Sequence, residues 1–172
     1  MTKLLLRFVH EFKDRHGKVR RYVRRPGFAH VPLPGEPGSP AFTRTWQDIA
    51  TRQPAALHAA EHAYVKRTAY DPAVAGIRAA TGIDLDRAPL PIRDALWSTA
   101  VQHGPGSLAR KTGAITIFIE ALRRSGGQTS TSDPRFFRIL ASAVYQRRTA
   151  YWKLDKERYA SELSAVLAGL TP

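Results

Sequence analysis

The stretch WSTAVQHG, residues 97–104, places two hydroxyls, an amide and an imidazole on a segment that is otherwise apolar. The apolar side chains in and beside it recur at the three- and four-residue spacing of one helix face: Leu96, Trp97, Ala100 and Val101. Gly104 follows, and glycine is the usual residue just past the end of a helix. The stretch therefore predicts a core helix over residues 90–103 that runs out into a glycine loop.

The polar side chains of this helix leave an active site open as the other interpretation. His103 could act as a general base, because imidazole titrates near neutral pH, and Thr99 lies one helical turn before it on the same face. A catalytic triad also needs a third group that orients the imidazole and a loop that stabilises the oxyanion. The sequence shows neither. We therefore expect Gln102 and His103 to cap the last carbonyls of the helix, with groove lining as their alternative role.

Prolines and glycines divide the rest of the chain in the same way. Prolines stand where a first helical turn would begin, at Pro40, Pro54, Pro72 and Pro134. Three of them follow residues that favour the N-cap position, namely Ser39, Asp71 and Asp133, and helix stops are expected at Gly82 and Gly126. The predicted helices cover 41–52, 54–69, 72–81, 90–103, 114–124, 134–148 and 155–168. These signals predict a mainly α protein, a compact helical lobe of about six or seven helices.

One predicted helix has a competing interpretation as a strand. Residues 114–122 read AITIFIEAL and are rich in β-branched side chains, which suit a buried strand. The flanking residues favour a core helix, and we predict a helix here.

The N-terminal residues predict a different structure, a basic β-hairpin. Leu4–Phe12 and Val19–Arg25 are rich in β-branched, aromatic and arginine residues, and KDRHGK between them supplies turn chemistry. Between Lys3 and Arg25 nine lysines and arginines face two acidic residues, a net charge of +7. We therefore predict three parts: a hairpin arm over 1–25, a Pro/Gly linker over 26–40, and the helical lobe over 41–172.

Charge and composition bound the function. The chain has 172 residues, a net charge of +13 and no cysteine, so it offers neither a disulfide nor a thiol nucleophile. We expect no membrane span and no signal peptide, which predicts a protein that is cytoplasmic as synthesised. A strongly basic protein is drawn to polyanions. One predicted partner is therefore the DNA phosphate backbone, bound non-specifically by cations of the hairpin: Lys18, Arg20, Arg21, Arg24 and Arg25.

Two short patterns suggest catalysis on their own. HAAEH, residues 58–62, fits a zinc-peptidase pattern with two histidines one turn apart, but catalytic zinc needs a third protein ligand. We interpret the motif as the polar face of a helix and predict no metal and no cofactor. A glycosidase needs two facing carboxyl groups, and the sequence offers five carboxylates that could supply them: Glu61, Asp71, Asp84, Asp86 and Asp94. We keep Glu61 and Asp71 as weak catalytic candidates and expect Asp86 and Asp94 to pair with Arg87 and Arg93.

Longer stretches resemble two known families. Residues 3–42, with HEFKDRHGKVRRYVRRPGF, VPLPG and GSPAF, resemble the arm that opens phage-type integrases, without the catalytic part of those enzymes. Residues 41–168, with YDPAV, TGIDLD and WSTAVQHG in that order, resemble the C-terminal half of the peptidoglycan-hydrolysing extension of type VI secretion spike proteins. They also resemble related phage lysins of the lysozyme/chitosanase-like superfamily.

The second resemblance implies a lysozyme-like half that forms one wall of a glycan groove. It places five residues near the ligand, Tyr70, Asp71, Trp97, Gln102 and His103, and names peptidoglycan glycan strands as a partner. It also implies a muramidase-like glycoside hydrolase, of phage or type VI secretion origin, that leaves the cell by the secretion apparatus or by phage lysis.

This chain departs from that family's pattern in two ways. Glu61 stands where the family usually has glutamine. The upstream segments that carry the family's catalytic Glu and Asp have no counterpart among the 172 residues. We therefore expect a hydrolase-like protein that is inactive alone, with a nucleic-acid-binding accessory protein as the alternative. Whether this chain is itself an enzyme stays open at this point.

Overall fold

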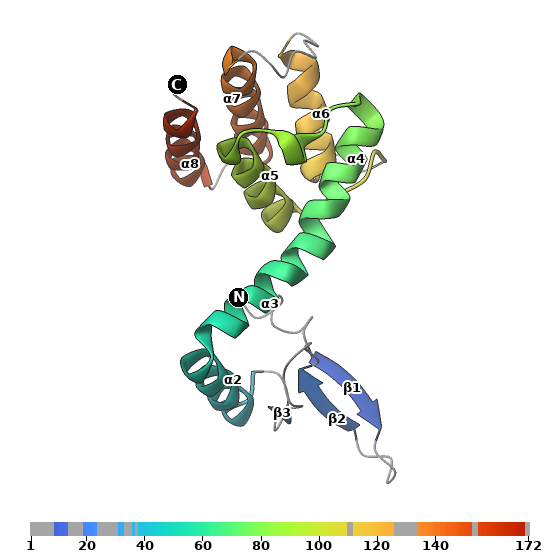
Figure 1. Cartoon of the computed structure of the whole chain (residues 1–172), viewed down its shortest axis with the longest axis vertical. Helices are drawn as coiled ribbons and strands as arrows, with labels where there is room; N and C mark the ends of the chain where they lie inside the picture. The colour runs from blue at the N-terminus through green and yellow to red at the C-terminus, as the bar shows by residue number, and fades with distance from the viewer. Residues whose placement is uncertain are drawn as a thin grey trace. The chain divides into compact units, whose positions relative to one another are not determined.

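The computed structural model describes residues 9–13, 19–23, 31–32, 36, 38–109, 112–125, 134–152 and 155–170. Contacts between Cα atoms divide the chain into two compact units, residues 1–63 and 64–172. The division falls inside a run of helix and not near residue 40, where the composition of the sequence changes. Each unit is described below by itself (Figure 1).

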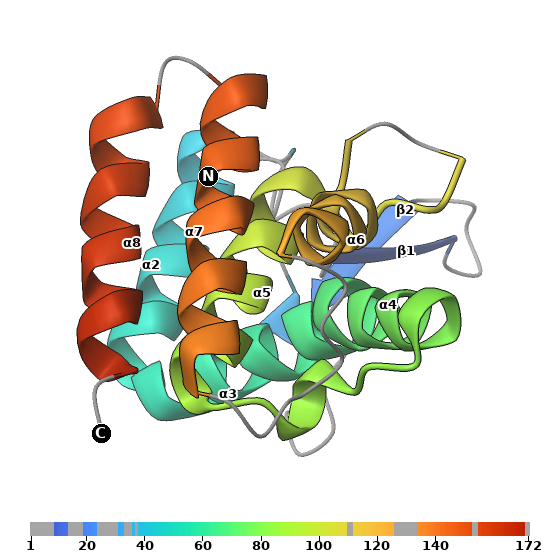
Figure 2. The ribbon, with the colours of Figure 1, turned by 90° about the horizontal axis from the view of Figure 1, so that it is seen from above.

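The second unit is helical throughout its described elements. It contains η2 (Lys66–Tyr70), α4 (Asp71–Thr81), η3 (Leu85–Arg87), α5 (Leu90–His103), α6 (Ala114–Arg124), α7 (Pro134–Tyr151) and α8 (Lys156–Gly169). α7 and α8 lie side by side and run in opposite directions, and α5 packs against both of them and against α6 (Figures 1 and 2). The prediction of a mainly α protein is confirmed, and residues 114–122 belong to a helix.

The first unit contains α2 (Pro40–Arg52) and the start of α3 (Pro54–Val65). α2 begins as the sequence predicts, because the side chain of Ser39 accepts a hydrogen bond from the backbone N–H of Phe42 at 3.3 Å and Pro40 occupies the first turn. The buried ring of Phe42 packs against Trp46 and Ile49, which makes a small cluster separate from the main core.

Three short strands precede these helices. β1 (Val9–Lys13) pairs antiparallel with β2 (Val19–Val23), and β2 pairs with β3 (Val31–Pro32). The predicted turn at 14–18 and most of the predicted linker over 26–40 lie outside the described residues. The complete basic hairpin therefore stays a prediction.

The predicted helix break before Pro72 is wrong. α3 continues through the π-helical turn η2 into α4 without interruption, so Asp71 lies inside helix and its side chain caps nothing. Proline cannot donate the next helical hydrogen bond, and its ring crowds the carbonyl one turn earlier. The wider π turn, in which the N–H of Asp71 bonds the carbonyl of Lys66, accommodates this defect within one helix.

The main core lies wholly in the second unit. Its buried residues run from Tyr70 to Val166, and α4, α5, α6 and α7 each contribute side chains that are fully enclosed, such as Ile77, Leu96, Phe118 and Leu140. α4 can approach α6 closely because a β-carbon at Gly76 would overlap the side chain of Ile115. Burial of this apolar surface is the main source of the unit's stability.

Gly82 ends α4 as the sequence predicts. It adopts the left-handed conformation at φ 75° and donates its N–H to the carbonyl of Arg78, which is a common way for a helix to stop. Among the described helices, none is both long enough and apolar enough to cross a membrane.

Candidate functional site

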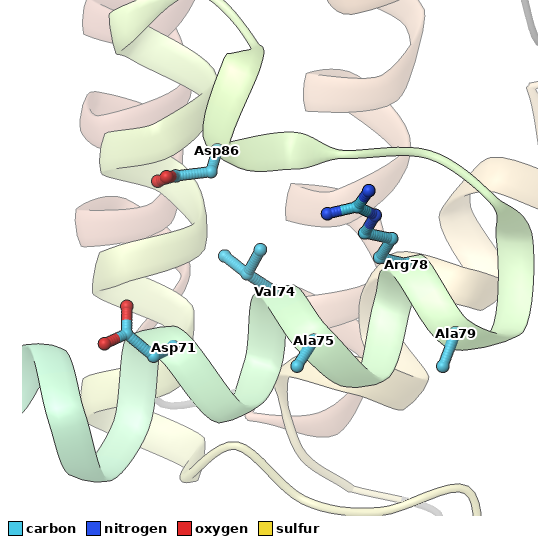
Figure 3. A pocket seen from close by; sticks show the side chains of 6 residues that line it. All are labelled: Asp71, Val74, Ala75, Arg78, Ala79 and Asp86. Carbon is cyan, nitrogen blue, oxygen red and sulfur yellow. The ribbon is translucent and has the colours of Figure 1, made fainter.

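A hollow of about 550 Å³ opens beside the first turns of α4. It is lined by Asp71, Val74, Ala75, Arg78, Ala79 and Asp86. Figure 3 shows the side chain of Asp71 rising from α4 and that of Asp86 coming from η3 on the other side of Val74. The hollow therefore brings together two carboxylates that are fifteen positions apart in the sequence.

Each of these carboxylates has a defined partner. Nζ of Lys66 donates to Oδ1 of Asp71 at 2.5 Å, and this hydrogen bond raises the pKa of Lys66. The hydroxyl of Tyr70 donates to Oδ1 of Asp86 at 3.0 Å. Burial of Tyr70 and this bond to Asp86 both raise the pKa of the phenol, because each disfavours the phenolate. Tyr70 is thus a neutral, buried donor that holds Asp86 in place.

An aromatic pair joins Tyr70 to α5. The ring of Tyr70, which is buried, lies 5.4 Å from the ring of Trp97 on α5, measured between centroids. Tilted aromatic pairs at this distance are favourable. Three of the five predicted groove residues, Tyr70, Asp71 and Trp97, therefore lie together. Asp86, in the stretch TGIDLD, is their neighbour through Tyr70, whereas the sequence predicted Arg87 as its partner and Arg87 instead pairs with Asp84.

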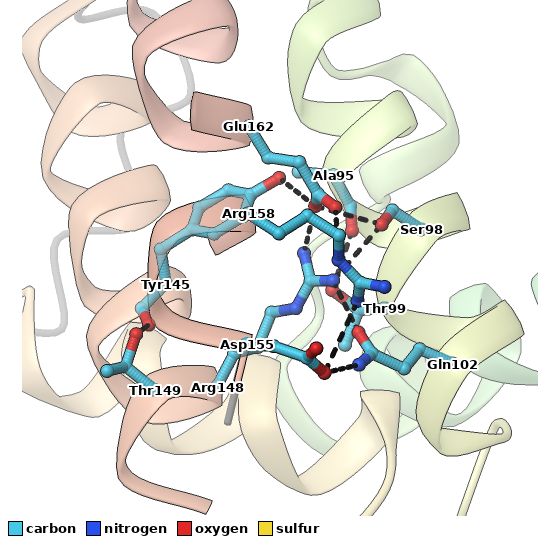
Figure 4. Close-up of polar contacts among 10 residues, drawn as sticks. All are labelled: Ala95, Ser98, Thr99, Gln102, Tyr145, Arg148, Thr149, Asp155, Arg158 and Glu162. Atoms are coloured by element: carbon cyan, nitrogen blue, oxygen red, sulfur yellow. Dashed lines mark hydrogen bonds and ion pairs between the residues drawn. The ribbon is translucent and has the colours of Figure 1, made fainter. Parts of the chain in front are cut away.

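The other two predicted groove residues, Gln102 and His103, belong to different surroundings. Gln102 accepts a hydrogen bond from Nη2 of Arg148 at 2.8 Å and donates to Oδ2 of Asp155 at 2.9 Å. It therefore joins α5 to α7 and to the start of α8, and it does not cap the end of α5 as expected. Figure 4 shows it within a set of polar side chains that come from these three helices.

Arg148 is the centre of this polar set. It is fully buried, and its guanidinium donates to Glu162 at 2.8 Å, to Ser98 at 3.1 Å and to Gln102 (Figure 4). Ser98 and the hydroxyl of Tyr145 also donate to the same oxygen of Glu162. A buried charge is tolerated only when it is paired and hydrogen-bonded, and here one carboxylate and two neutral acceptors meet that need.

Two aromatic rings enclose the same guanidinium. It lies 4.8 Å from the ring of Tyr145 and 4.5 Å from that of Tyr159, measured from Cζ to the centroids. Cation–π contacts of this kind strengthen when water is excluded. The polar residues of WSTAVQHG are thus explained in large part by Arg148, which lies about fifty positions further along the chain.

His103 makes no cap either. Both of its ring nitrogens are buried without a hydrogen-bond partner among the described residues, and its ring contacts that of Trp152 in a tilted arrangement, with the centroids 4.2 Å apart. Burial, together with the positive charges of Arg148 and Arg158, lowers the pKa of His103 to about 4, with burial as the largest cause. A neutral, enclosed imidazole has no nucleophile to activate, since Thr99 donates instead to the carbonyl of Ala95.

His58, Glu61 and His62 of the HAAEH motif lie on α3. His58 and His62 are exposed on α3, and no group of three metal-ligating side chains forms among the residues that the structure describes. Glu61 lies in the first unit and Asp71 in the second. Their assignment as catalytic candidates therefore stays a prediction.

Comparison with known proteins identifies the family. Residues 9–165 match the family model described as "Type VI secretion system spike protein VgrG3-like, C-terminal". The chain belongs to this family. Within it, the type VI secretion system spike protein VgrG3 of Vibrio cholerae serotype O1 (strain ATCC 39315 / El Tor Inaba N16961) is 25% identical over 157 residues. These residues cover 88% of this chain and 15% of that protein, so the chain corresponds to a small part of its relative.

The VgrG3-like match also bears on the N-terminal arm. It begins at residue 9 and continues through residues 26–40, so most of the arm falls in the same match as the helices. The predicted resemblance of residues 3–42 to integrases is not shown. Of the predicted DNA-binding cations, Arg20 and Arg21 lie on β2, whereas Lys18, Arg24 and Arg25 lie outside the described residues. DNA binding stays a prediction.

Proposed function

We propose that this VgrG3-like chain binds glycan strands of peptidoglycan in the hollow beside α4, as a hydrolase-like protein that does not cleave them alone. The observation that carries the proposal is the meeting of Asp71 and Asp86 in one hollow, where Asp86 accepts a hydrogen bond from Tyr70 and Tyr70 packs against Trp97. The family match adds a secretion spike as the context in which such a chain would reach a cell wall.

The chemistry of the hollow suits a sugar. Carboxylate oxygens accept hydrogen bonds from hydroxyl groups, and the two aspartates offer such acceptors from opposite sides of Val74 (Figure 3). Arg78 adds guanidinium donors for glycan amide or carboxylate oxygens, although it also pairs with Asp84 at 3.5 Å. A few placed polar groups around an apolar floor are typical of small-ligand sites.

The same contacts argue against hydrolysis by this hollow. Glycoside cleavage needs one carboxylic acid that donates a proton to the leaving oxygen and a second carboxylate that acts as base or nucleophile. Asp71 is already an acceptor for Lys66, and Asp86 is an acceptor for Tyr70. Neither is placed as a proton donor, which agrees with the absence from these 172 residues of the segments that the resemblance assigns to catalysis.

Sedimentation with purified sacculi tests the proposal. The wild-type chain should pellet with sacculi at low and at high salt, and the supernatant should contain no soluble muropeptides. The double variant Asp71→Asn/Asp86→Asn should lose the salt-resistant part, with affinity reduced by about tenfold or more. Asparagine still accepts a hydrogen bond, but a bond to a charged group is worth about 1 kcal/mol more than a neutral one.

Asp94→Asn is the matched control, because Asp94 is an exposed aspartate of α5 that does not line this hollow. It should pellet like the wild type at high salt. Equal pelleting of the double variant and the control would contradict the glycan site. Release of muropeptides by the wild type would contradict the proposed lack of cleavage.

A further inference from the structure

A separate hollow of about 360 Å³ lies against α6, α7 and α8, and its lining includes Arg124, Arg138, Ile139, Ser142, Gln146 and Leu167. We propose that this hollow is a docking surface for an acidic segment of a partner protein, one that carries carboxylates beside an apolar side chain. The proposal does not rest on glycan binding, because it concerns different residues.

The charge of this hollow sets it apart. Asp71 and Asp86 line the hollow beside α4, and a third hollow beside α5 contains Asp94 and Glu162. Among the residues that the structure describes, no acidic residue lines the hollow of Arg124 and Arg138. It therefore presents positive charge without a carboxylate in its wall, and a ligand that is negatively charged would be complementary to it.

The two arginines also lack acidic partners nearby. Arg147, Arg148 and Arg158 each pair with a carboxylate of this unit. Within the described part of the chain no such ion pair involves Arg124 or Arg138. Two guanidinium groups next to one hollow can therefore pair with an anion from another molecule.

The geometry of Arg138 fixes one side of the hollow. Its Nη1 donates to the backbone carbonyl of Leu167 at 2.9 Å, near the end of α8. A guanidinium has five donors in a planar fork that fits a carboxylate with two parallel bonds. One donor is used by Leu167, and the remaining donors are available to a ligand.

Apolar surface decides between a protein and a phosphate polymer as occupant. Ile139 is 50% exposed although it is a large aliphatic residue, and it lies in the hollow with Leu167. A phosphodiester backbone would neutralise the arginines and leave Ile139 uncovered, whereas a peptide side chain would bury it. Arginines around an apolar centre are also the composition found at energetically important parts of protein interfaces.

Fluorescence anisotropy with the full chain tests this surface. The probe is a blocked, fluorescein-labelled peptide of glutamate and leucine residues, compared with the same peptide in which serine replaces leucine, at near-physiological salt. The wild type should bind the leucine peptide several-fold more tightly. Arg124→Gln/Arg138→Gln should weaken that binding about tenfold, and Ile139→Ser should abolish the preference for leucine over serine.

The control Arg87→Gln/Arg123→Gln removes the same charge from exposed positions that do not line the hollow. It should change binding less than threefold, in line with weak long-range attraction at this salt. Equal weakening by both double variants would overturn the proposal in favour of net charge. So would equal binding of the two peptides, or a duplex oligonucleotide that binds more tightly and loses binding in Arg124→Gln/Arg138→Gln. Circular dichroism of each variant confirms that it is folded.

Discussion

At the scale of single residues, His103 links the fold to pH. Both ring nitrogens are buried, the ring packs at a tilt against Trp152, and the cations Arg148 and Arg158 lie near it, so its pKa is lowered to about 4. In the unfolded chain the imidazole of His103 has its ordinary pKa of about 6.5. Between these values the unfolded state holds more protons than the folded state, so stability falls as the pH falls.

We predict that the free energy of unfolding decreases by about 1–2 kcal/mol through His103 alone between pH 7 and pH 5. His103→Leu should remove this part of the pH dependence, because leucine does not titrate. Urea unfolding followed by tryptophan fluorescence at the two pH values measures it. His58→Gln, at an exposed position of α3, should keep the wild-type dependence, and an unchanged dependence in His103→Leu would contradict the assignment.

At the scale of elements, one carboxylate joins three helices. Glu162 of α8 accepts from Ser98 of α5 and from Tyr145 and Arg148 of α7. It also pairs with Arg158 of its own helix at 3.2 Å. The two arginines differ in burial, since Arg148 is fully buried and the side chain of Arg158 is 51% exposed. The interior pair should therefore contribute much more to helix packing than the surface pair.

This difference gives a matched prediction. Arg148→Met should lower the free energy of unfolding by about 3–5 kcal/mol, because it leaves buried acceptors without their donor. Arg158→Met should cost at most about 1 kcal/mol, the value of an exposed pair. Urea midpoints of the two variants provide the comparison, and similar losses in both would show that Arg148 is not the centre of the network.

At the scale of the whole molecule, the core belongs to one unit. Among the described residues, those buried in this core lie between Tyr70 and Val166, whereas Phe42 of the first unit forms a separate cluster with Trp46 and Ile49. A unit with its own core is able to fold by itself. The family match, by contrast, covers both units from residue 9 to residue 165.

We predict that the fragment 64–172 folds without the first unit. It should show a helical spectrum and a cooperative urea transition, with a midpoint close to that of a fragment over residues 41–172. A fragment 64–172 that unfolds without cooperativity would show that α2 and α3 are needed for folding. The boundary of the folding unit would then lie near residue 40, where the composition of the sequence changes.

Much of the fold followed from local signals, because caps, prolines and glycines act over one helical turn. Ser39 and Pro40 start α2 and Gly82 ends α4 as predicted. The predicted helix break at Asp71 was wrong because a π turn accommodates Pro72 inside a continuous helix. No residue in the immediate neighbourhood predicts that turn.

The candidate site also combines residues that the sequence predicted with contacts that only the tertiary structure shows. Tyr70, Asp71 and Trp97 were expected together because the family resemblance places all three near the ligand. The contact of Asp86 with Tyr70, and the contacts of Arg148 with Ser98 and Gln102, could not be predicted in this way. These contacts join residues that are 16 to 50 positions apart. Local pattern decided where helices form, and only the packing of α4, α5, α7 and α8 decided which polar groups meet, because a buried charge selects its partners through space.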